Sequence, residues 1–191
     1  TGLPFDDGLV GSGLTDCGSV VVRYGVVGRG LAGGLADTVL SQFAAGSLNP
    51  PEANDHYGYA LAAGDFNGDG IDDLAIGVPG DRQWDGGTQE YENTGAVEIH
   101  YGQEGGIQPV GEHHLMQGTF SSHNGDRLGE ALAVGNFNGD FYDDLAVGIP
   151  RDHLFAAGGF VWPAGSVWVL HGHFGGLVPL EGFLVHQDAA D

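Results

Sequence analysis

The chain has 191 residues, of which 41% are hydrophobic, and its 26 acidic residues outnumber five basic ones to give a formal net charge of −21. This charge excludes a nucleic-acid partner bound through its phosphates, and it disfavours docking on an anionic membrane surface. No apolar run reaches the roughly 18 residues of a spanning helix, so we expect no membrane insertion. The sequence begins without the basic segment of a signal peptide, and the lone Cys17 has no partner for an internal disulfide.

The first 50 residues predict an incomplete set of strands. In residues 18–25, Val20, Val22 and Tyr24 alternate with Val21 and Arg23, and this period of two with β-branched residues is typical of a strand that packs on both faces. Residues 38–43 predict a second, outer strand. Residues 2–11 resemble residues 139–148, and this match predicts a degenerate strand near the start of the chain.

The next two stretches are copies of one another. Residues 57–81 and 128–152 are identical at 16 of 25 positions at an offset of 71. In the first copy, four short strands separated by glycine-rich turns are predicted at 60–64, 74–78, 95–102 and 113–117. The second copy ends in two matching strands, at 165–172 and 182–186.

A repeat of 70 to 77 residues with four short strands and no helical period indicates an all-β fold, built of β-propeller blades with four antiparallel strands each. The alternative is a two-sheet sandwich, which has similar strands but no reason for such a repeat. We expect one partial propeller domain over 1–191: an incomplete blade at 1–50, a blade with a calcium loop at 51–120, and one with a degenerate loop at 121–191. Two and a half to three blades are fewer than the roughly four to eight of a closed propeller, so the chain is expected to be part of a larger propeller or of an assembly.

The first calcium loop is predicted between the first two strands of the second blade. Side-chain oxygens stand at positions 1, 3, 5 and 9 of DFNGDGIDD, a glycine stands at 6, and a backbone carbonyl is available at 7. Ca²⁺ prefers six to eight oxygen ligands, which alternate residues of a tight turn can direct inward. The predicted ligands are Asp65, Asn67, Asp69, the carbonyl of Ile71, and Asp73.

The equivalent loop of the third blade, NFNGDFYDD, predicts a weaker calcium site. Asn136 replaces an acid and Phe141 replaces the flexible glycine. The predicted ligands are Asn136, Asn138, Asp140, the carbonyl of Tyr142, and Asp144. Near the N-terminus, Asp6 and Asp7 lack the rest of this pattern, and no ion is expected there.

The histidines and tryptophans suggest other binding sites besides the two calcium loops. His113 and His114 are adjacent on a predicted strand and point to opposite faces, so zinc binding by this pair is not expected, and His171 near His173 occupies a strand position that favours packing. The aromatic residues Trp84, Trp162 and Trp168 allow a carbohydrate-stacking platform, although covering a neighbouring blade explains them more simply. No motif of a nucleophilic, zinc-protease or phosphate-binding site is present.

The two copies also carry a family resemblance. The order YG…LAAGDFNGDGIDDLAIGVP, with Tyr57-Gly58 and Gly77-Val78-Pro79 at its ends, resembles the FG-GAP repeat of integrin α-subunit propellers and of many secreted bacterial proteins. The resemblance implies a seven-bladed propeller with Ca²⁺ in the loops on one face, where the ion is mainly structural. The five residues of the first loop match the family's metal positions one by one, whereas Asn136 and Phe141 depart from them.

These observations predict a non-enzymatic, calcium-stabilised propeller module of an extracellular or cell-surface protein, which serves adhesion or binds a protein or ligand. Its partners would be a protein, the remaining blades, or a second copy of the chain. One alternative is an accessory domain of a secreted enzyme whose catalytic residues lie outside these 191 positions. Another is a structural subunit that stacks through its open blades into a ring or fibre. Cys17 could then cross-link neighbours, although a single buried thiol is the more common fate.

Overall fold

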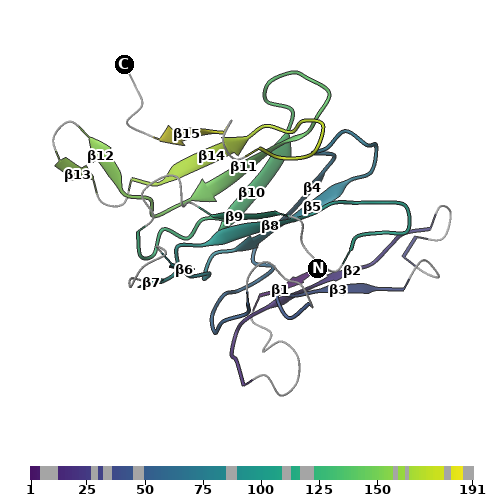
Figure 1. The fold of residues 1–191 in the computed structure, drawn as a ribbon, viewed down its shortest axis with the longest axis horizontal. Coiled ribbons are helices and arrows are strands. Elements are labelled where there is room, and N and C mark those ends of the chain that lie inside the picture. The colour runs from purple at the N-terminus through teal and green to yellow at the C-terminus, as the bar shows by residue number, and fades with distance from the viewer. Residues whose placement is uncertain are drawn as a thin grey trace.

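The computed structural model shows an all-β chain in which three antiparallel sheets follow one another (Figure 1). No helix occurs among the residues that it describes, so none there could cross a membrane. The described residues are 1–4, 13–26, 30–31, 36–44, 50–84, 90–108, 113–116, 123–156, 159–161, 164–178 and 182–186.

The second sheet has four strands in the order β4-β5-β8-β9. These strands are β4 (Leu61–Gly64), β5 (Asp73–Val78), β8 (Ala96–His100) and β9 (His113–Met116). Each strand pairs with the next along the chain, and Gly77 faces Val97 in the register of β5 and β8. The four predicted strands of this blade are therefore confirmed.

The third sheet repeats the second in the order β10-β11-β14-β15. Its strands are β10 (Ala131–Gly135), β11 (Asp144–Ile149), β14 (Ser166–Leu170) and β15 (Phe183–His186). Gly148 faces Val167 here, as Gly77 faces Val97 in the second sheet. The predicted four-stranded antiparallel blade thus occurs twice.

The first sheet has three strands in the order β1-β2-β3: β1 (Gly2–Leu3), β2 (Ser19–Val22) and β3 (Thr38–Leu40). Gly2 faces Val20, which makes Gly2-Leu3-Pro4 the counterpart of Gly77-Val78-Pro79. The predicted match of residues 2–11 to 139–148 was therefore wrong in register, since β1 is the end of the second strand of a blade and not its acidic beginning. Asp6 and Asp7 lie outside the described residues.

Two small hairpins lie in the connections after β5 and β11, where the sequence predicted no strands. They pair β6 (Gln83–Trp84) with β7 (Glu90–Tyr91), and β12 (Leu154–Ala156) with β13 (Gly159–Val161). Strands of two or three residues are too short to show an alternating pattern, so sequence periodicity could not predict them.

The same contacts join each sheet to the next. Leu128 bridges Gly95 and its amide donates to the Thr94 carbonyl at 2.9 Å, as Tyr57 bridges Gly18 one sheet earlier. The Gly129 that follows Leu128 sits against Gly77 so closely that a Cβ on Gly77 would overlap the Gly129 carbonyl oxygen. This close approach explains why both positions are glycine, and it fixes the third sheet against the second.

Tyrosine hydroxyls form a second recurring contact between sheets. The Ile107 amide donates to the Tyr24 hydroxyl at 2.7 Å, and the Leu177 amide donates to the Tyr101 hydroxyl at 3.1 Å. Tyr24 and Tyr101 stand at equivalent positions just after β2 and β8, and His171 takes this position after β14.

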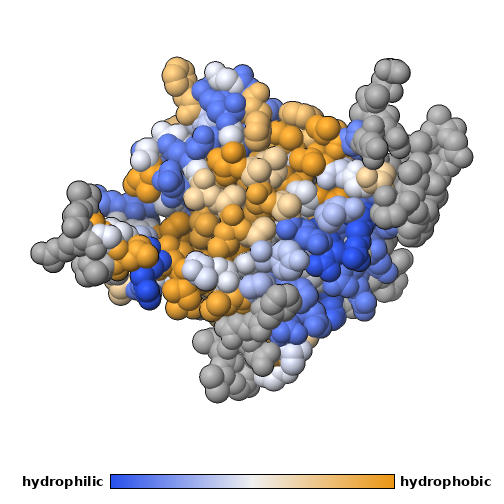
Figure 2. Space-filling view, turned by 180° about the vertical axis from the view of Figure 1, so that it is seen from behind, coloured by the Kyte–Doolittle hydropathy of each residue, from blue (hydrophilic) through white to orange (hydrophobic). Residues whose placement is uncertain are grey.

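The main core lies between the second and third sheets and contains Phe66, Val97, Leu128 and Trp168, all at most 1% exposed. Trp168 is therefore part of the core and contributes to no exposed aromatic platform; the side chains of Trp84 and Trp162 lie outside the described residues. Cys17 is buried as well, which agrees with the more common fate expected of a lone thiol and not with a cross-link between neighbouring copies. Hydrophobic side chains also gather into a broad area on the face seen in Figure 2, with hydrophilic ones along its edges.

Candidate metal centre

The loop between β4 and β5 gathers its side-chain oxygens through short-range hydrogen bonds. Asp65 accepts the Gly68 and Asp69 amides at Oδ1 (2.7 and 3.1 Å) and the Gly70 amide at Oδ2 (2.8 Å). The Asp69 amide also donates to Asn67 Oδ1 at 2.8 Å, and the Ile71 amide donates to Asp69 Oδ1 at 2.8 Å. Because a carboxylate has about four lone-pair sites over its two oxygens, these contacts hold the carboxylates in place and leave acceptor capacity for a cation.

Asp73 anchors the base of this loop. It is 1% exposed, and its two oxygens accept the Phe66 and Gly102 amides at 2.9 Å each. Burial raises the pKa of Asp73 to about 6; the two amides oppose this shift, and the charges of Asp69 and Asp65 add to it. Clustered like charges of this kind are stabilised by a divalent cation.

Gly70 stands at the sixth position of the loop with φ of +88°, and nothing lies within 4 Å of a Cβ built on it. A backbone in this region favours glycine, as the sequence pattern predicted.

The loop between β10 and β11 has the same hydrogen-bond pattern. The Gly139 amide donates to Asn136 Oδ1 at 2.7 Å, and the Tyr142 amide donates to Asp140 Oδ1 at 2.8 Å. Asp144 is fully buried and accepts the Phe137 and Gly172 amides at 2.7 and 2.9 Å. The two loops therefore share several of their hydrogen bonds despite their sequence differences.

Three features distinguish the second loop from the first. Asn136 uses its amide nitrogen to donate to the Asp140 carbonyl at 2.6 Å, where Asp65 offers a second carboxylate oxygen. Phe141 replaces Gly70 and its side chain is 97% exposed. His171 Nδ1 lies 3.3 Å from Asp144 Oδ1, whereas Tyr101 takes the equivalent position in the preceding blade. The ten predicted ligand residues are thus brought together in two loops, and their occupancy stays a prediction.

Asp143 has a role that no sequence motif predicted. Its Oδ2 accepts the Asp65 amide at 3.0 Å, and its own amide donates to the Asp65 carbonyl at 3.0 Å. The two acidic loops therefore lie side by side at one end of the sheets, and Asp143 of the third sheet positions the first ligand of the loop before it (Figure 1). Only the packing of one sheet on the next reveals this contact.

A buried polar cluster crosses the second sheet away from these loops. Tyr57 OH lies 2.9 Å from His100 Nε2, which is 3.5 Å from Glu98 Oε2. His114 lies between Asp81 Oδ2 (3.3 Å from Nε2) and Glu98 Oε1 (3.6 Å from Nδ1). Burial alone would lower the pKa of His114, but the two carboxylates outweigh it and raise the pKa to about 9. His114 is therefore a charged structural residue at neutral pH.

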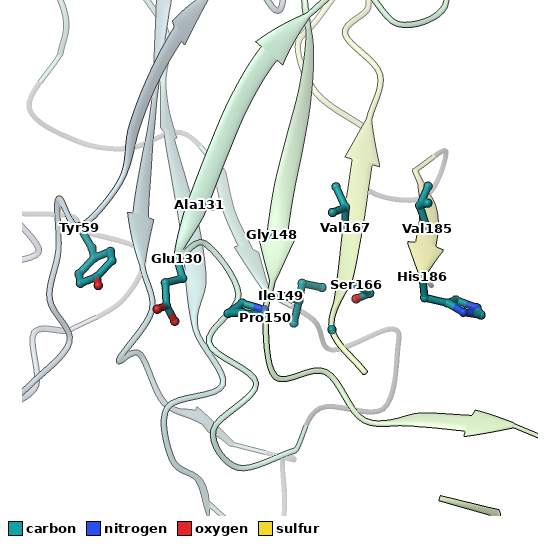
Figure 3. A pocket seen from close by; sticks show the side chains of 11 residues that line it. Tyr59, Glu130, Ala131, Gly148, Ile149, Pro150, Ser166, Val167, Val185 and His186 are labelled. Carbon is teal, nitrogen blue, oxygen red and sulfur yellow. The ribbon is translucent and has the colours of Figure 1, made fainter. Parts of the chain in front are cut away.

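A hollow of about 760 Å³ lies over the third sheet (Figure 3). Its lining includes Gly148, Ile149, Ser166, Val167 and Val185 from three strands of this sheet. Val167 is 39% exposed and Val185 is 46% exposed, so the floor of the hollow is an apolar strand surface open to solvent.

A family model for the FG-GAP repeat matches residues 57–97 and 128–170. Each match begins at the residue that bridges the preceding sheet and includes one acidic loop. The chain is an FG-GAP repeat protein.

Known proteins with similar sequences fall into two groups. The FG-GAP chain is 36% identical over 140 residues to phosphatidylinositol-glycan-specific phospholipase D of Rattus norvegicus, covering 70% of this chain and 15% of that protein. It is 38% identical over 107 residues to integrin alpha-PS2 of Drosophila melanogaster, covering 53% of this chain and 7% of that protein. It is 36% identical over 127 residues to integrin alpha-6 of Gallus gallus, covering 63% and 10%. The chain thus spans at most 15% of the length of these relatives, and it resembles the integrin alpha chains in its repeats.

Proposed function

We propose that this chain is a calcium-stabilised, non-enzymatic β-propeller module of an extracellular or cell-surface protein, which binds a protein partner or ligand in adhesion. The observation that carries the proposal is the pair of matching acidic loops, in which hydrogen bonds gather side-chain oxygens at one end of two adjacent sheets. The likeness to integrin alpha chains supports the same assignment.

The residues present fit a calcium ion. In the first loop Asp65, Asn67, Asp69 and Asp73 would supply side-chain oxygens, and Ile71 would supply its carbonyl. When bound, Ca²⁺ offsets the mutual repulsion of the carboxylates. The second loop would use Asn136, Asn138, Asp140 and Asp144 with the Tyr142 carbonyl, and its lower charge predicts weaker binding. Millimolar calcium outside cells suits sites of this strength, which supports the extracellular location.

Thermal unfolding of the full chain with and without a calcium chelator tests the stabilising role. We expect calcium to raise the melting temperature, because the ion binds the folded loops and not the unfolded chain. Asp65→Asn combined with Asp69→Asn should remove most of this shift. Asp72→Asn is the matched control, since Asp72 is an exposed acid of the same loop outside the ligand set. A melting temperature that calcium leaves unchanged in the parent chain would contradict the proposal.

We further propose that one continuous propeller segment spans 1–191, with units at 1–50, 51–120 and 121–191, and that further blades cover the third sheet. Three equivalent pairs support this. Val97 is fully buried and Val167 is 39% exposed; Leu115 is 4% exposed and Val185 is 46% exposed; Phe66 is fully buried and Phe137 is 52% exposed. In each pair the buried member belongs to the second sheet and packs against the third sheet, whereas the exposed member belongs to the third sheet. A hydrophobic dye should bind the isolated chain, and Val167→Asp should abolish that binding; a chain that binds no dye would contradict the open face.

The likeness to a phospholipase D favours a second candidate, an accessory domain of a secreted enzyme whose catalytic part lies outside residues 1–191. The two candidate functions predict the same properties for residues 1–191. They differ in what the rest of the coding sequence would encode. A hydrolase domain encoded in the same reading frame would support the second candidate. A third candidate, a subunit that stacks into a ring or fibre, predicts a large scattering mass for the isolated chain in light scattering.

A further inference from the structure

Three side chains outside the acidic loops converge at the junction of the second and third sheets. His123 and Asp126 lie on the turn before β10, and His153 lies on the turn after β11. His153 Nδ1 is 3.1 Å from Asp126 Oδ1, and His123 Nδ1 is 3.9 Å from Asp126 Oδ2. One ligand atom from each of the three residues lies within 4.8 Å of the other two. A tetrahedral ion with ligands at about 2.0–2.2 Å separates them by roughly 3.3–3.6 Å, so small side-chain rotations suffice.

The turn holds these groups in a largely buried position. Asp126 is fully buried, the side chain of His153 is 6% exposed, and that of His123 is 28% exposed, which leaves one side open to solvent. Asp126 Oδ2 accepts the His123 amide at 2.7 Å. Asp126 Oδ1 accepts no hydrogen bond from the described residues although it is buried. The second oxygen therefore faces the imidazoles as an available ligand atom.

The preceding repeat shows what this turn does without histidines. Glu52, Asp55 and Arg82 stand 71 residues before His123, Asp126 and His153. Asp55 Oδ2 accepts the Glu52 amide at 2.6 Å, so the backbone of the turn is the same. There the side chains form an ion pair, with Arg82 Nε 3.6 Å from Glu52 Oε2. In the later repeat His123 takes the place of Glu52 and His153 takes the place of Arg82, so two imidazoles replace the ion pair.

The surroundings favour a cation at this point. Asp152 is buried beside Asp126, accepts the Ser166 hydroxyl at 2.6 Å, and adds a second negative charge to the site. Two imidazole nitrogens and a carboxylate suit Zn²⁺ and related transition ions, whereas Ca²⁺ prefers oxygen alone. We propose that His123, Asp126 and His153 form a zinc-class site, with water completing the coordination, separate from the two calcium loops.

Such a site would fasten one blade to the next. The Gly125 amide donates to the Glu92 carbonyl at 2.9 Å, and the Glu92 amide donates to Asn124 Oδ1 at 3.0 Å. An ion on His123 and His153 would tie this inter-sheet turn to the end of β11. The expected consequence is a zinc-dependent rise in stability beyond that given by calcium.

The test is isothermal titration of the full chain with Zn²⁺ in saturating calcium, which occupies the acidic loops. We expect one tight zinc equivalent, and Co²⁺ in its place should give the visible absorption of a tetrahedral nitrogen-oxygen site. The double variant His123→Glu/His153→Arg imports the ion pair of the preceding repeat, so it should fold, and it should bind zinc at least 100-fold more weakly. His173→Gln, at an exposed histidine elsewhere, should bind like the parent chain.

His123→Asn is a milder second variant, because this partly exposed residue supports the turn through its backbone amide. It should weaken zinc binding at least tenfold and leave the circular dichroism spectrum unchanged. A parent chain that binds no zinc, or variants at His123 and His153 that bind it with the parent affinity, would overturn the proposal.

Discussion

The contact between the second and third sheets predicts that one glycine is indispensable and its repeat counterpart is not. Gly77 and Gly148 stand at the same position of β5 and β11. A Cβ on Gly77 would lie less than 3.0 Å from the Gly129 carbonyl oxygen, a backbone atom that cannot rotate away. A Cβ on Gly148 would meet nothing closer than the Ala131 Cβ at 3.2 Å.

The expected cost of Gly77→Ala follows from what must move. Relieving the overlap pushes Gly129 outward, and this overpacking costs about 1–3 kcal/mol. It also strains the hydrogen bond from the Leu128 amide to the Thr94 carbonyl, which contributes about 1 kcal/mol. We therefore expect Gly77→Ala to lower the free energy of unfolding by roughly 2–4 kcal/mol, and Gly148→Ala to lower it by less than roughly 1 kcal/mol.

Urea unfolding followed by circular dichroism measures both variants. With an m-value of about 2 kcal/mol/M, the midpoint should fall by roughly 1–2 M for Gly77→Ala and hardly at all for Gly148→Ala. Equal effects of the two substitutions, within about 0.5 kcal/mol, would refute the packing of the third sheet on the second.

Two further predictions concern single side chains. Asn136→Asp adds a carboxylate to the second acidic loop and should tighten its calcium binding by roughly tenfold in a calcium titration, with unchanged affinity counting against this loop as a site. His114→Gln removes the cation between Asp81 and Glu98: because folding raises the pKa of His114 from 6.5 to about 9, its stabilisation is fully present below pH 6.5 and is lost as the pH rises through 9. The stability difference between the parent chain and this variant should therefore reach roughly 3 kcal/mol near pH 6 and shrink above pH 9, and a difference that is independent of pH would contradict the buried charge.

The strands were predictable because their signal is local. The alternation in 18–25 and 95–102, and the copy of it at 165–172, made each central strand visible in a single window of sequence. The copied block at 57–81 and 128–152 then set the order of the strands in two blades.

The register predicted for residues 2–11 was wrong because the match to residues 139–148 rested on two acidic residues. Asp6 and Asp7 suggested a match to Asp143 and Asp144, whereas the pairing of Gly2 with Val20 shows that the shorter Gly2-Leu3-Pro4 match to Gly77-Val78-Pro79 is the structural one. A match of three residues, such as Gly2-Leu3-Pro4, is too short to be recognised from sequence alone. The backbone pairing of Gly2 with Val20 nevertheless fixes the register of β1.

The contacts between repeats could not be predicted from one repeat. Asp143 supports Asp65 across 78 residues, a relation that no motif spacing contains. The sequence does contain a signal for the histidine cluster, because His123 and His153 stand 71 residues after Glu52 and Arg82 of the earlier repeat. Paired changes between copies of a repeat are the signal that would have found it.

The central claim is that the two acidic loops are calcium sites of unequal strength, and equilibrium calcium binding by the full chain tests it most directly. We predict two saturable sites, with the tighter one lost in Asp65→Asn/Asp69→Asn and the weaker one lost in Asp140→Asn. A chain that binds no calcium in the millimolar range, or that binds it equally well after these substitutions, would contradict the claim.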